Sequence, residues 1–157
     1  MKLTGRCSCG QVRYEIRNEP LFTQACHCTD CQRTTGSAFV IHAVVCEEDV
    51  DLTGETKMSL APTGSGAGCE LHACATCGVI IWVRYCYHQV PVIAIRAGTF
   101  TDTGALVPQA HIFTSRKQSW VNIPSDVPAF AEGLDRDAVW PSKSIERYQN
   151  LPKLVQH

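Results

Sequence analysis

Cys26-His27-Cys28-Thr29-Asp30-Cys31 is the stretch that decides the fold, because it places three thiols and one imidazole in six residues. Two further thiol pairs flank it, Cys7-Ser8-Cys9 upstream and Cys74-Ala75-Thr76-Cys77 downstream. Thiolates at such spacings are typical ligands of zinc, which takes four ligands tetrahedrally. The three groups therefore predict two zinc sites, one formed by four cysteines and one by three.

Length and charge indicate a single globular domain and exclude several classes of protein. The chain has 157 residues, is 45% hydrophobic and carries a formal net charge of −1 at pH 7. We therefore expect no nucleic-acid or membrane partner. The longest uninterrupted apolar run, Val79 to Val83, is too short to span a bilayer.

The N-terminal residues lack an apolar signal-peptide core, so the expected location is cytoplasmic. Clustered cysteines there bind metal or perform chemistry more often than they form disulfides. A disulfide framework remains the alternative for the ten cysteines, but Cys-x-Cys neighbours are poor disulfide partners for each other.

Hydrophobic and polar side chains alternate over short segments of the chain. In residues 11–16, Val12, Tyr14 and Ile16 share one face, as expected of a half-buried strand. Similar segments predict strands at 38–46, 50–52, 57–60, 69–73, 79–85, 92–100 and 109–113. Since no long amphipathic helix accompanies them, we expect a mainly β domain.

The remaining segments are predicted to be connections and short helical turns. Residues 20–25 should connect two elements, and 29–36 should form a helical turn that ends at a glycine. The Gly-rich residues 61–68 are either an exposed loop or a mobile lid over a site. Residues 128–133 are expected to form a helical turn, and 145–155 either a short helix or a loose tail.

The site formed by four cysteines is predicted to join the first thiol pair of the chain to the last. Cys74-x-x-Cys77 presents two sulfurs to one ion, and Gly78 helps the backbone turn back. Cys7 and Cys9 can supply the other two ligands. Four thiolates complete the coordination of zinc, so this site should be structural.

The other site keeps only Cys26, Cys28 and Cys31, which is the pattern of a catalytic zinc with one exchangeable position. A side chain could instead close it, and the candidates are His27, His42, His72, His111 and Cys69. Three thiolates on a divalent ion give a net charge of −1, which weakens its Lewis acidity. Exchange of one thiolate for another is then favoured over activation of water, and the expected substrate is a thiol or a thiol adduct.

The cysteine groups, in this order, resemble those of the glutathione-dependent formaldehyde-activating enzyme family, which includes the centromere protein V group. The resemblance covers roughly residues 3–125. It rests on Gly5-x-Cys7-x-Cys9-Gly10, Cys26 to Phe39, Cys74-x-x-Cys77-Gly78, Ala97-Gly98-Thr99 and His111-Ile112-Phe113. It implies an antiparallel β-tent fold, similar to the Mss4-like folds, and a carbon–sulfur lyase reaction that joins glutathione and formaldehyde or separates them.

The resemblance also implies two zinc ions per chain, a structural one on Cys7, Cys9, Cys74 and Cys77 and a catalytic one on Cys26, Cys28 and Cys31. We expect residues 1–134 to form the family-type domain and 135–157 a C-terminal tail. The expected partner is a small thiol such as glutathione. Arg33 is the candidate to bind its carboxylates, because it is basic and follows the three-cysteine motif directly.

Other interpretations of the sequence remain open. His27 and Asp30 lie inside the motif and could move protons or orient the cysteines. The chain could also be a non-catalytic zinc-binding module for protein interaction, with residues 61–68 and the Pro-rich end as contact surfaces. Redox sensing or metal buffering through the three-cysteine site is a third hypothesis.

Overall fold

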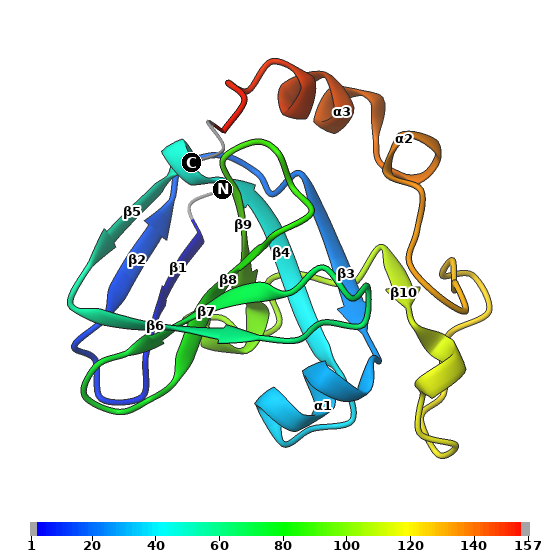
Figure 1. The fold of residues 1–157 in the computed structure, drawn as a ribbon, viewed down its shortest axis with the longest axis horizontal. Helices are drawn as coiled ribbons and strands as arrows, with labels where there is room; N and C mark the ends of the chain where they lie inside the picture. Colours follow the sequence, from blue (N-terminus) through cyan, green and yellow to red (C-terminus); the bar gives the residue numbers. More distant parts are fainter. Residues whose placement is uncertain (1–2, 155–157) are drawn as a thin grey trace.

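Two β-sheets form the body of the protein, as the computed structural model of the chain shows for residues 3–154 (Figure 1). The small sheet has the order β1 (Leu3–Arg6), β2 (Arg13–Ile16) and β5 (Val50–Thr53). The large sheet has seven strands. In spatial order they are β10 (Ala110–Ile112), β3 (Phe22–Cys26), β4 (Val40–Cys46), β9 (Val92–Arg96), β8 (Ile80–Tyr85), β7 (Cys69–Cys74) and β6 (Thr56–Ala61).

The main core lies between the two sheets. Val12, Tyr14 and Ile16 bring one face of the small sheet to it, as their alternation predicted. Val45 and Ile95, on neighbouring strands of the large sheet, pack against them. Burying these apolar side chains supplies most of the driving force for folding.

The helices are short and lie outside the two sheets (Figure 1). α1 (Thr29–Thr35) follows β3 directly and ends at Gly36 in the left-handed conformation. α2 (Arg136–Val139) and α3 (Ser142–Gln149) follow β10. Single 3₁₀ turns occupy Glu47–Asp49, Ala97–Thr99 and Thr114–Arg116. Among residues 3–154, no helix has the length and apolar character needed to cross a bilayer.

The predicted fold class, a mainly β domain, is confirmed, and the large sheet is antiparallel except where β10 pairs with β3. Two local predictions are wrong. Residues 20–25 are not a connection, because 22–26 form β3, a fully buried strand that does not alternate. Residues 128–133 are not helical, because Ala129 bridges to His111 in parallel. The strands predicted at 50–52 and 57–60 are present as β5 and β6, which follow each other at a turn and belong to different sheets.

The C-terminal segment packs on the face of the large sheet opposite the main core. Trp140 stacks on Phe22 of β3, with ring centroids 5.6 Å apart. Tyr148 and Leu151 join the same buried cluster, together with Val44. Residues 145–155 were expected to be a short helix or a loose tail, and α3 provides the helix.

Acidification is expected to weaken this packing, because His88 must then take up a proton. Its Nδ1 lies 2.9 Å from the Tyr148 hydroxyl. Burial, aided by the charge of Arg136, lowers the pKa of His88 to about 4. The unfolded chain binds this proton more readily, so stability falls as the pH drops from 6.5 towards 4, by an amount on the order of 2–3 kcal/mol.

Chemical denaturation at a series of pH values would measure this effect. The wild type should lose more stability between pH 6.5 and 4 than His88→Gln, which has no proton to gain at this position. Buried histidines elsewhere contribute equally to both proteins. Identical pH profiles would contradict the prediction.

Candidate metal centres and the adjoining cavity

The four-cysteine group predicted from the sequence is assembled in the structure. The sulfur atoms of Cys7, Cys9, Cys74 and Cys77 all lie within 4.8 Å of one another. The Sγ atoms of Cys7 and Cys9 are 3.4 Å apart, and those of Cys9 and Cys74 are 3.8 Å apart. Four soft sulfur donors at these separations fit a tetrahedral thiolate site of the kind that zinc occupies.

Two similar backbone turns present these thiols. The Cys7 N–H donates to the Val12 carbonyl at 3.0 Å, and the Cys74 N–H donates to the Val79 carbonyl at 2.9 Å. Gly78, with φ of 75°, occupies the left-handed region in the second turn, where other residues are strained. The same short sequence pattern therefore folds in the same way at two distant points of the chain.

The environment of Cys7 favours its thiolate form, whereas the pKa of its neighbour Cys9 is raised. Burial raises the pKa of Cys7, but the Val12 N–H, which donates to its sulfur at 3.2 Å, lowers it. The neighbouring thiols act in the same direction, and the resulting pKa of Cys7 is about 6. Metal ligands must lose their protons, so these interactions prepare the site for binding.

The three-cysteine group is also assembled, and all its members are buried. Cys26 ends β3, Cys28 caps the N-terminus of α1, and Cys31 lies in the first turn of that helix. The Cys31 N–H donates to the Cys28 sulfur at 3.3 Å. Hydrogen bonds from the thiols of Cys26 and Cys31, together with this contact, lower the pKa of Cys28. The thiols of Cys28 and Cys31, together with burial, raise the pKa of Cys26.

Among the described residues, no fourth cysteine, histidine or carboxylate joins the three sulfurs, which lie within 4.8 Å of one another. None of the sequence-based candidates for the fourth ligand is therefore in place, namely His27, His42, His72, His111 and Cys69. Two of them instead contact each other, because His27 Nε2 lies 2.8 Å from His111 Nδ1. The donor set fits a thiophilic divalent ion with one position left to a non-protein ligand.

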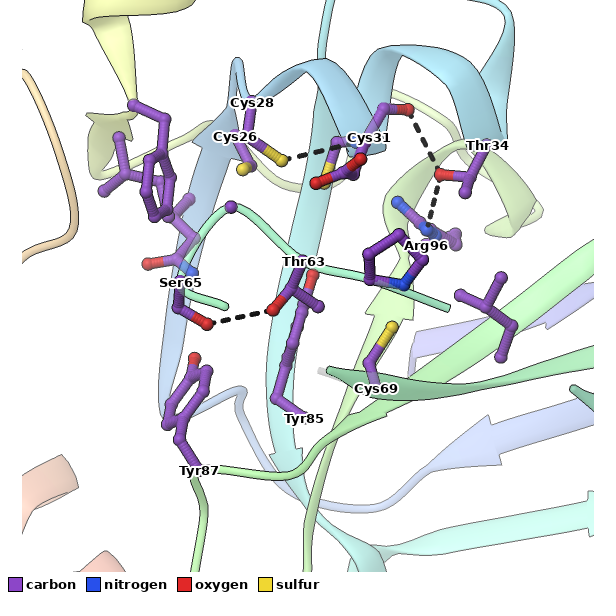
Figure 2. Close-up of a pocket in the computed structure, with 17 residues that line it drawn as sticks. Cys26, Cys28, Cys31, Thr34, Thr63, Ser65, Cys69, Tyr85, Tyr87 and Arg96 are labelled. Atoms are coloured by element: carbon purple, nitrogen blue, oxygen red, sulfur yellow. Dashed lines mark hydrogen bonds between the residues drawn. The ribbon is translucent and has the colours of Figure 1, made fainter. Parts of the chain in front are cut away.

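A small cavity of about 40 Å³ opens beside the three sulfurs (Figure 2). Its apolar wall includes Leu71, Ile112 and Phe113. Hydroxyl groups and one guanidinium also face it, from Thr34, Thr63, Ser65, Tyr85, Tyr87 and Arg96. Thus the cavity combines a thiolate cluster with a largely dry wall and a few polar groups, as ligand sites do.

The Gly-rich segment 61–68 covers this cavity. Pro62, Thr63, Gly64 and Ser65 all line it. A Cβ atom on Gly64 would lie 2.7 Å from the Cys28 Cβ and 3.3 Å from its sulfur. Of the two interpretations of this segment, its position supports a lid over the site.

Replacing Gly64 with alanine is expected to lift this lid. The new methyl group would overlap the buried Cys28 side chain, and overpacking of this kind costs roughly 1–3 kcal/mol unless the chain moves. A surface loop moves more easily than a capped helix, so we expect alkylation of Cys28 in metal-free protein to accelerate several-fold. Gly104→Ala is the matched control, because a Cβ there meets only Asp102 at 3.5 Å. Peptide mass spectrometry would follow the reaction, and equal rates in the two variants would contradict the prediction.

The structure separates the polar residues that the sequence singled out. Asp30 lines the cavity, but its Oδ1 lies 3.5 Å from Nη1 of Arg33. The Arg33 side chain is 77% exposed and does not line the cavity. Its role in substrate binding stays a prediction, and the guanidinium that faces the cavity is that of Arg96.

Sequence reasoning did not select Arg96, Thr34 or Tyr85. Arg96 ends the strand Val92–Arg96, in which all five residues are buried. A charged residue at the end of an otherwise apolar strand was the available signal. Tyr85 ends β8 and reaches the same cavity, with its hydroxyl 3.2 Å from His42 Nε2.

Three cysteines, Cys46, Cys69 and Cys86, lie outside the motifs, and the sequence predicts that they are small buried apolar residues. Cys46 and Cys69 are buried, and Cys69 also lines the cavity. Cys86 is exposed, so this prediction is wrong for it. The sequence also predicts that Trp120 packs at the edge of the core, and its side chain is instead 69% exposed.

A wider groove of about 420 Å³ adjoins the cavity and shares five of its lining residues, Gln24, Ser65, Tyr87, Ile112 and Phe113. Its far wall comes from the C-terminal segment, through Arg136, Trp140 and Tyr148. The buried Nε1 of Trp140 has no hydrogen-bond partner within the described part of the chain. The cavity at the cysteines therefore continues into a space large enough for a bigger molecule.

Comparisons with known proteins agree with the site. The profile of the family described as glutathione-dependent formaldehyde-activating enzyme matches residues 2–116. A Halomonas elongata protein, provisionally named a glutathione-dependent formaldehyde-activating enzyme, is 26% identical over 132 residues, which cover 80% of this chain and 83% of the relative. A crystal structure of a Rhodobacter sphaeroides protein is similar at a TM-score of 0.47 and 20% identity, over 80% of this chain and 98% of that one. The match to the family profile spans both cysteine groups, and the chain belongs to the glutathione-dependent formaldehyde-activating enzyme family.

Proposed function

We propose that this protein is a zinc-dependent carbon–sulfur lyase-type enzyme that acts on a thiol adduct of a small aldehyde, such as S-hydroxymethylglutathione. The observation that carries the proposal is the group of Cys26, Cys28 and Cys31, which has no fourth protein ligand and opens into a covered cavity. The four-cysteine group would hold a second, structural zinc. Family membership supports a glutathione-related function.

Zinc bound to the three thiolates would supply a position that no protein ligand fills, where a substrate thiol could replace solvent and lose its proton. In the reaction proposed, the substrate sulfur forms a bond to the carbonyl carbon of formaldehyde. The carbonyl π electrons become a lone pair on oxygen, and that oxygen takes the proton which the thiol gave up. The reverse reaction breaks the carbon–sulfur bond and returns the proton to sulfur.

Residues of the cavity are suited to hold that oxygen and its proton. Burial raises the pKa of Tyr85 well above its usual value, so its hydroxyl stays protonated and can donate a hydrogen bond. Asp30, which also lines the cavity, can accept a proton at its carboxylate. The loop 61–68 would exclude bulk water while the adduct forms or breaks.

The dimensions of the site determine how a glutathione adduct would lie. A cavity of about 40 Å³ has room for only a few water molecules, so it suits a sulfur and the carbons next to it. The body of a tripeptide would have to lie in the adjoining groove. We therefore propose that the family domain expected over residues 1–134 provides the reacting groups, and that Arg136, Trp140 and Tyr148 of the C-terminal segment complete the wall that the substrate contacts.

Exchange NMR tests the proposal directly. Glutathione and formaldehyde interconvert with S-hydroxymethylglutathione at a measurable rate without a catalyst. The zinc-loaded protein at micromolar concentration should accelerate the exchange, and protein depleted of metal by a chelator should not. If the zinc-loaded protein leaves the exchange rate at its uncatalysed value, both with glutathione and with other thiols, the proposed activity is wrong.

A further inference from the structure

Arg96 is a buried cation with no carboxylate partner in the described part of the chain, although its positive charge acts on the buried thiol of Cys31. Its side chain is only 5% exposed. Among residues 3–154, the ion pairs found within 4.0 Å include no carboxylate partner for it. A guanidinium cannot shed its charge in a protein, and an isolated buried charge is costly. Two groups could balance this charge: the thiolates of the three-cysteine site, and an anionic group of a bound ligand.

The contacts of Arg96 hold it in place without neutralising it. Its Nη1 donates to His42 Nε2 at 3.0 Å, and its Nη2 lies 3.4 Å from the Thr34 hydroxyl. His42 is fully buried, and burial together with the charge of Arg96 keeps its pKa well below the usual value, so it is a neutral acceptor. The Nε of Arg96 has no partner within the described residues. The Nε–H of the guanidinium is thus left without an acceptor among them.

That guanidinium lies at the cavity beside the three cysteines (Figure 2). Thr34, which connects Arg96 to α1, also lines the cavity, and its hydroxyl donates to the Cys31 carbonyl at 3.2 Å. The other walls are largely apolar, so a charge in this space interacts more strongly than it would in water. Asp30 is the one carboxylate among the described residues that line the cavity, and its ion pair is with Arg33, at 3.5 Å, not with Arg96.

We propose that Arg96 binds an anionic group of the thiol ligand, so that the cavity selects small thiols that carry a carboxylate over neutral thiols of the same shape. This inference rests on the proposed function, because it assumes that a thiol enters the three-cysteine site. It goes further by naming the substrate class and the residue that recognises it. Because the cavity is small, the carboxylate must lie within a few bonds of the sulfur, so a compact thiol acid should occupy it better than glutathione, whose carboxylates lie further from its sulfur.

A matched pair of ligands tests this proposal on the zinc-loaded protein. 3-Sulfanylpropanoate and 3-sulfanylpropanamide have nearly the same shape, and only the first carries a charge. By titration calorimetry the wild type should bind the carboxylate at least about tenfold more tightly, as expected for a buried charge-assisted hydrogen bond. Arg96→Gln should bring the two affinities to within about threefold, and Arg96→Lys should retain part of the preference.

Each alternative has its own outcome. If neither thiol binds the wild type, the proposed function fails and the inference fails with it. If both bind with equal affinity, only the inference is overturned. A loss of zinc affinity in Arg96→Gln, with the preference for the carboxylate intact, would overturn it too, since Arg96 would then only balance the charge of the thiolates.

Arg33→Gln distinguishes the two candidate arginines, because Arg33 lies outside the cavity. It should keep the wild-type preference, and loss of the preference in this variant alone would overturn the assignment to Arg96. Arg96 also borders a second hollow, lined by Ile80, Gly98 and Thr103. An anion bound only in this second hollow would not change the relative affinity of the two matched thiols. Equal affinities would therefore exclude the cavity beside the three cysteines as the place where Arg96 binds an anion. The wild-type comparison decides the question even if Arg96→Gln fails to fold.

Discussion

Cys74→Ser is expected to remove one metal ion per chain and to unfold a large fraction of the protein at moderate denaturant concentration. Cys74 lies within the four-sulfur group, which joins the turn before β2 to the turn before β8. Structural zinc contributes folding free energy directly, and we expect the free energy of unfolding to fall by at least about 5 kcal/mol. Metal analysis and urea denaturation would measure the two effects.

Cys46→Ser is the matched control for this experiment. Cys46 is also buried, but it belongs to neither cysteine group. Burying a hydroxyl in place of a thiol should cost about 1–2 kcal/mol there and leave the metal content unchanged. If Cys74→Ser were no less stable than Cys46→Ser, the four-cysteine group would not have the structural role assigned to it.

Cys28→Ser is expected to abolish thiol binding and any lyase turnover while leaving most of the stability intact. A serine hydroxyl is a poor replacement for a thiolate ligand, so two sulfurs would remain for the metal of the three-cysteine site. Loss of the metal removes several kcal/mol of stabilisation from the reaction, which corresponds to a decrease of at least about 100-fold in kcat/KM. The four-cysteine site should keep its ion, so the metal content should fall to one per chain.

The exposed Cys86 supplies the control, since it lies outside both cysteine groups. Cys86→Ser should keep two metal ions and full activity. Calorimetric titration with glutathione and the exchange rate of its formaldehyde adduct would compare the variants. Unchanged glutathione binding and turnover in Cys28→Ser would show that the three-cysteine group is not where the substrate reacts.

Both cysteine groups could be predicted from the sequence because their members lie in short local motifs. Cys74-x-x-Cys77-Gly78 forms its turn through the Cys74–Val79 hydrogen bond and the positive φ of Gly78, and both depend on neighbouring residues only. Pairing with Cys7 and Cys9 followed from counting ligands, since zinc needs four. Alternation in Val12, Tyr14 and Ile16 likewise predicted a strand with one buried face.

Predictions were wrong where tertiary packing overrides the local pattern. All five residues of β3 are buried, so its sequence does not alternate. Strands β4 and β10 flank it within the sheet, and the C-terminal segment covers one of its faces. Because Thr23 and Gln24 are polar, the sequence predicts a connection in this segment in place of a strand. Residues 128–133 look able to form a helical turn, yet Ala129 pairs with His111 instead.

The cavity is the part of the site that only the tertiary structure decided. Its walls come from segments far apart in the chain, including the loop 61–68, Tyr85 and Arg96. Sequence spacing fixes which sulfurs can share an ion, because a few backbone bonds connect them. It does not fix which arginine faces the ion, because that depends on how β9 pairs with β4 and how both strands meet α1. The sequence by itself thus determined the three-thiol site, and the packing of distant strands determined that Arg96, rather than Arg33, lies at its cavity.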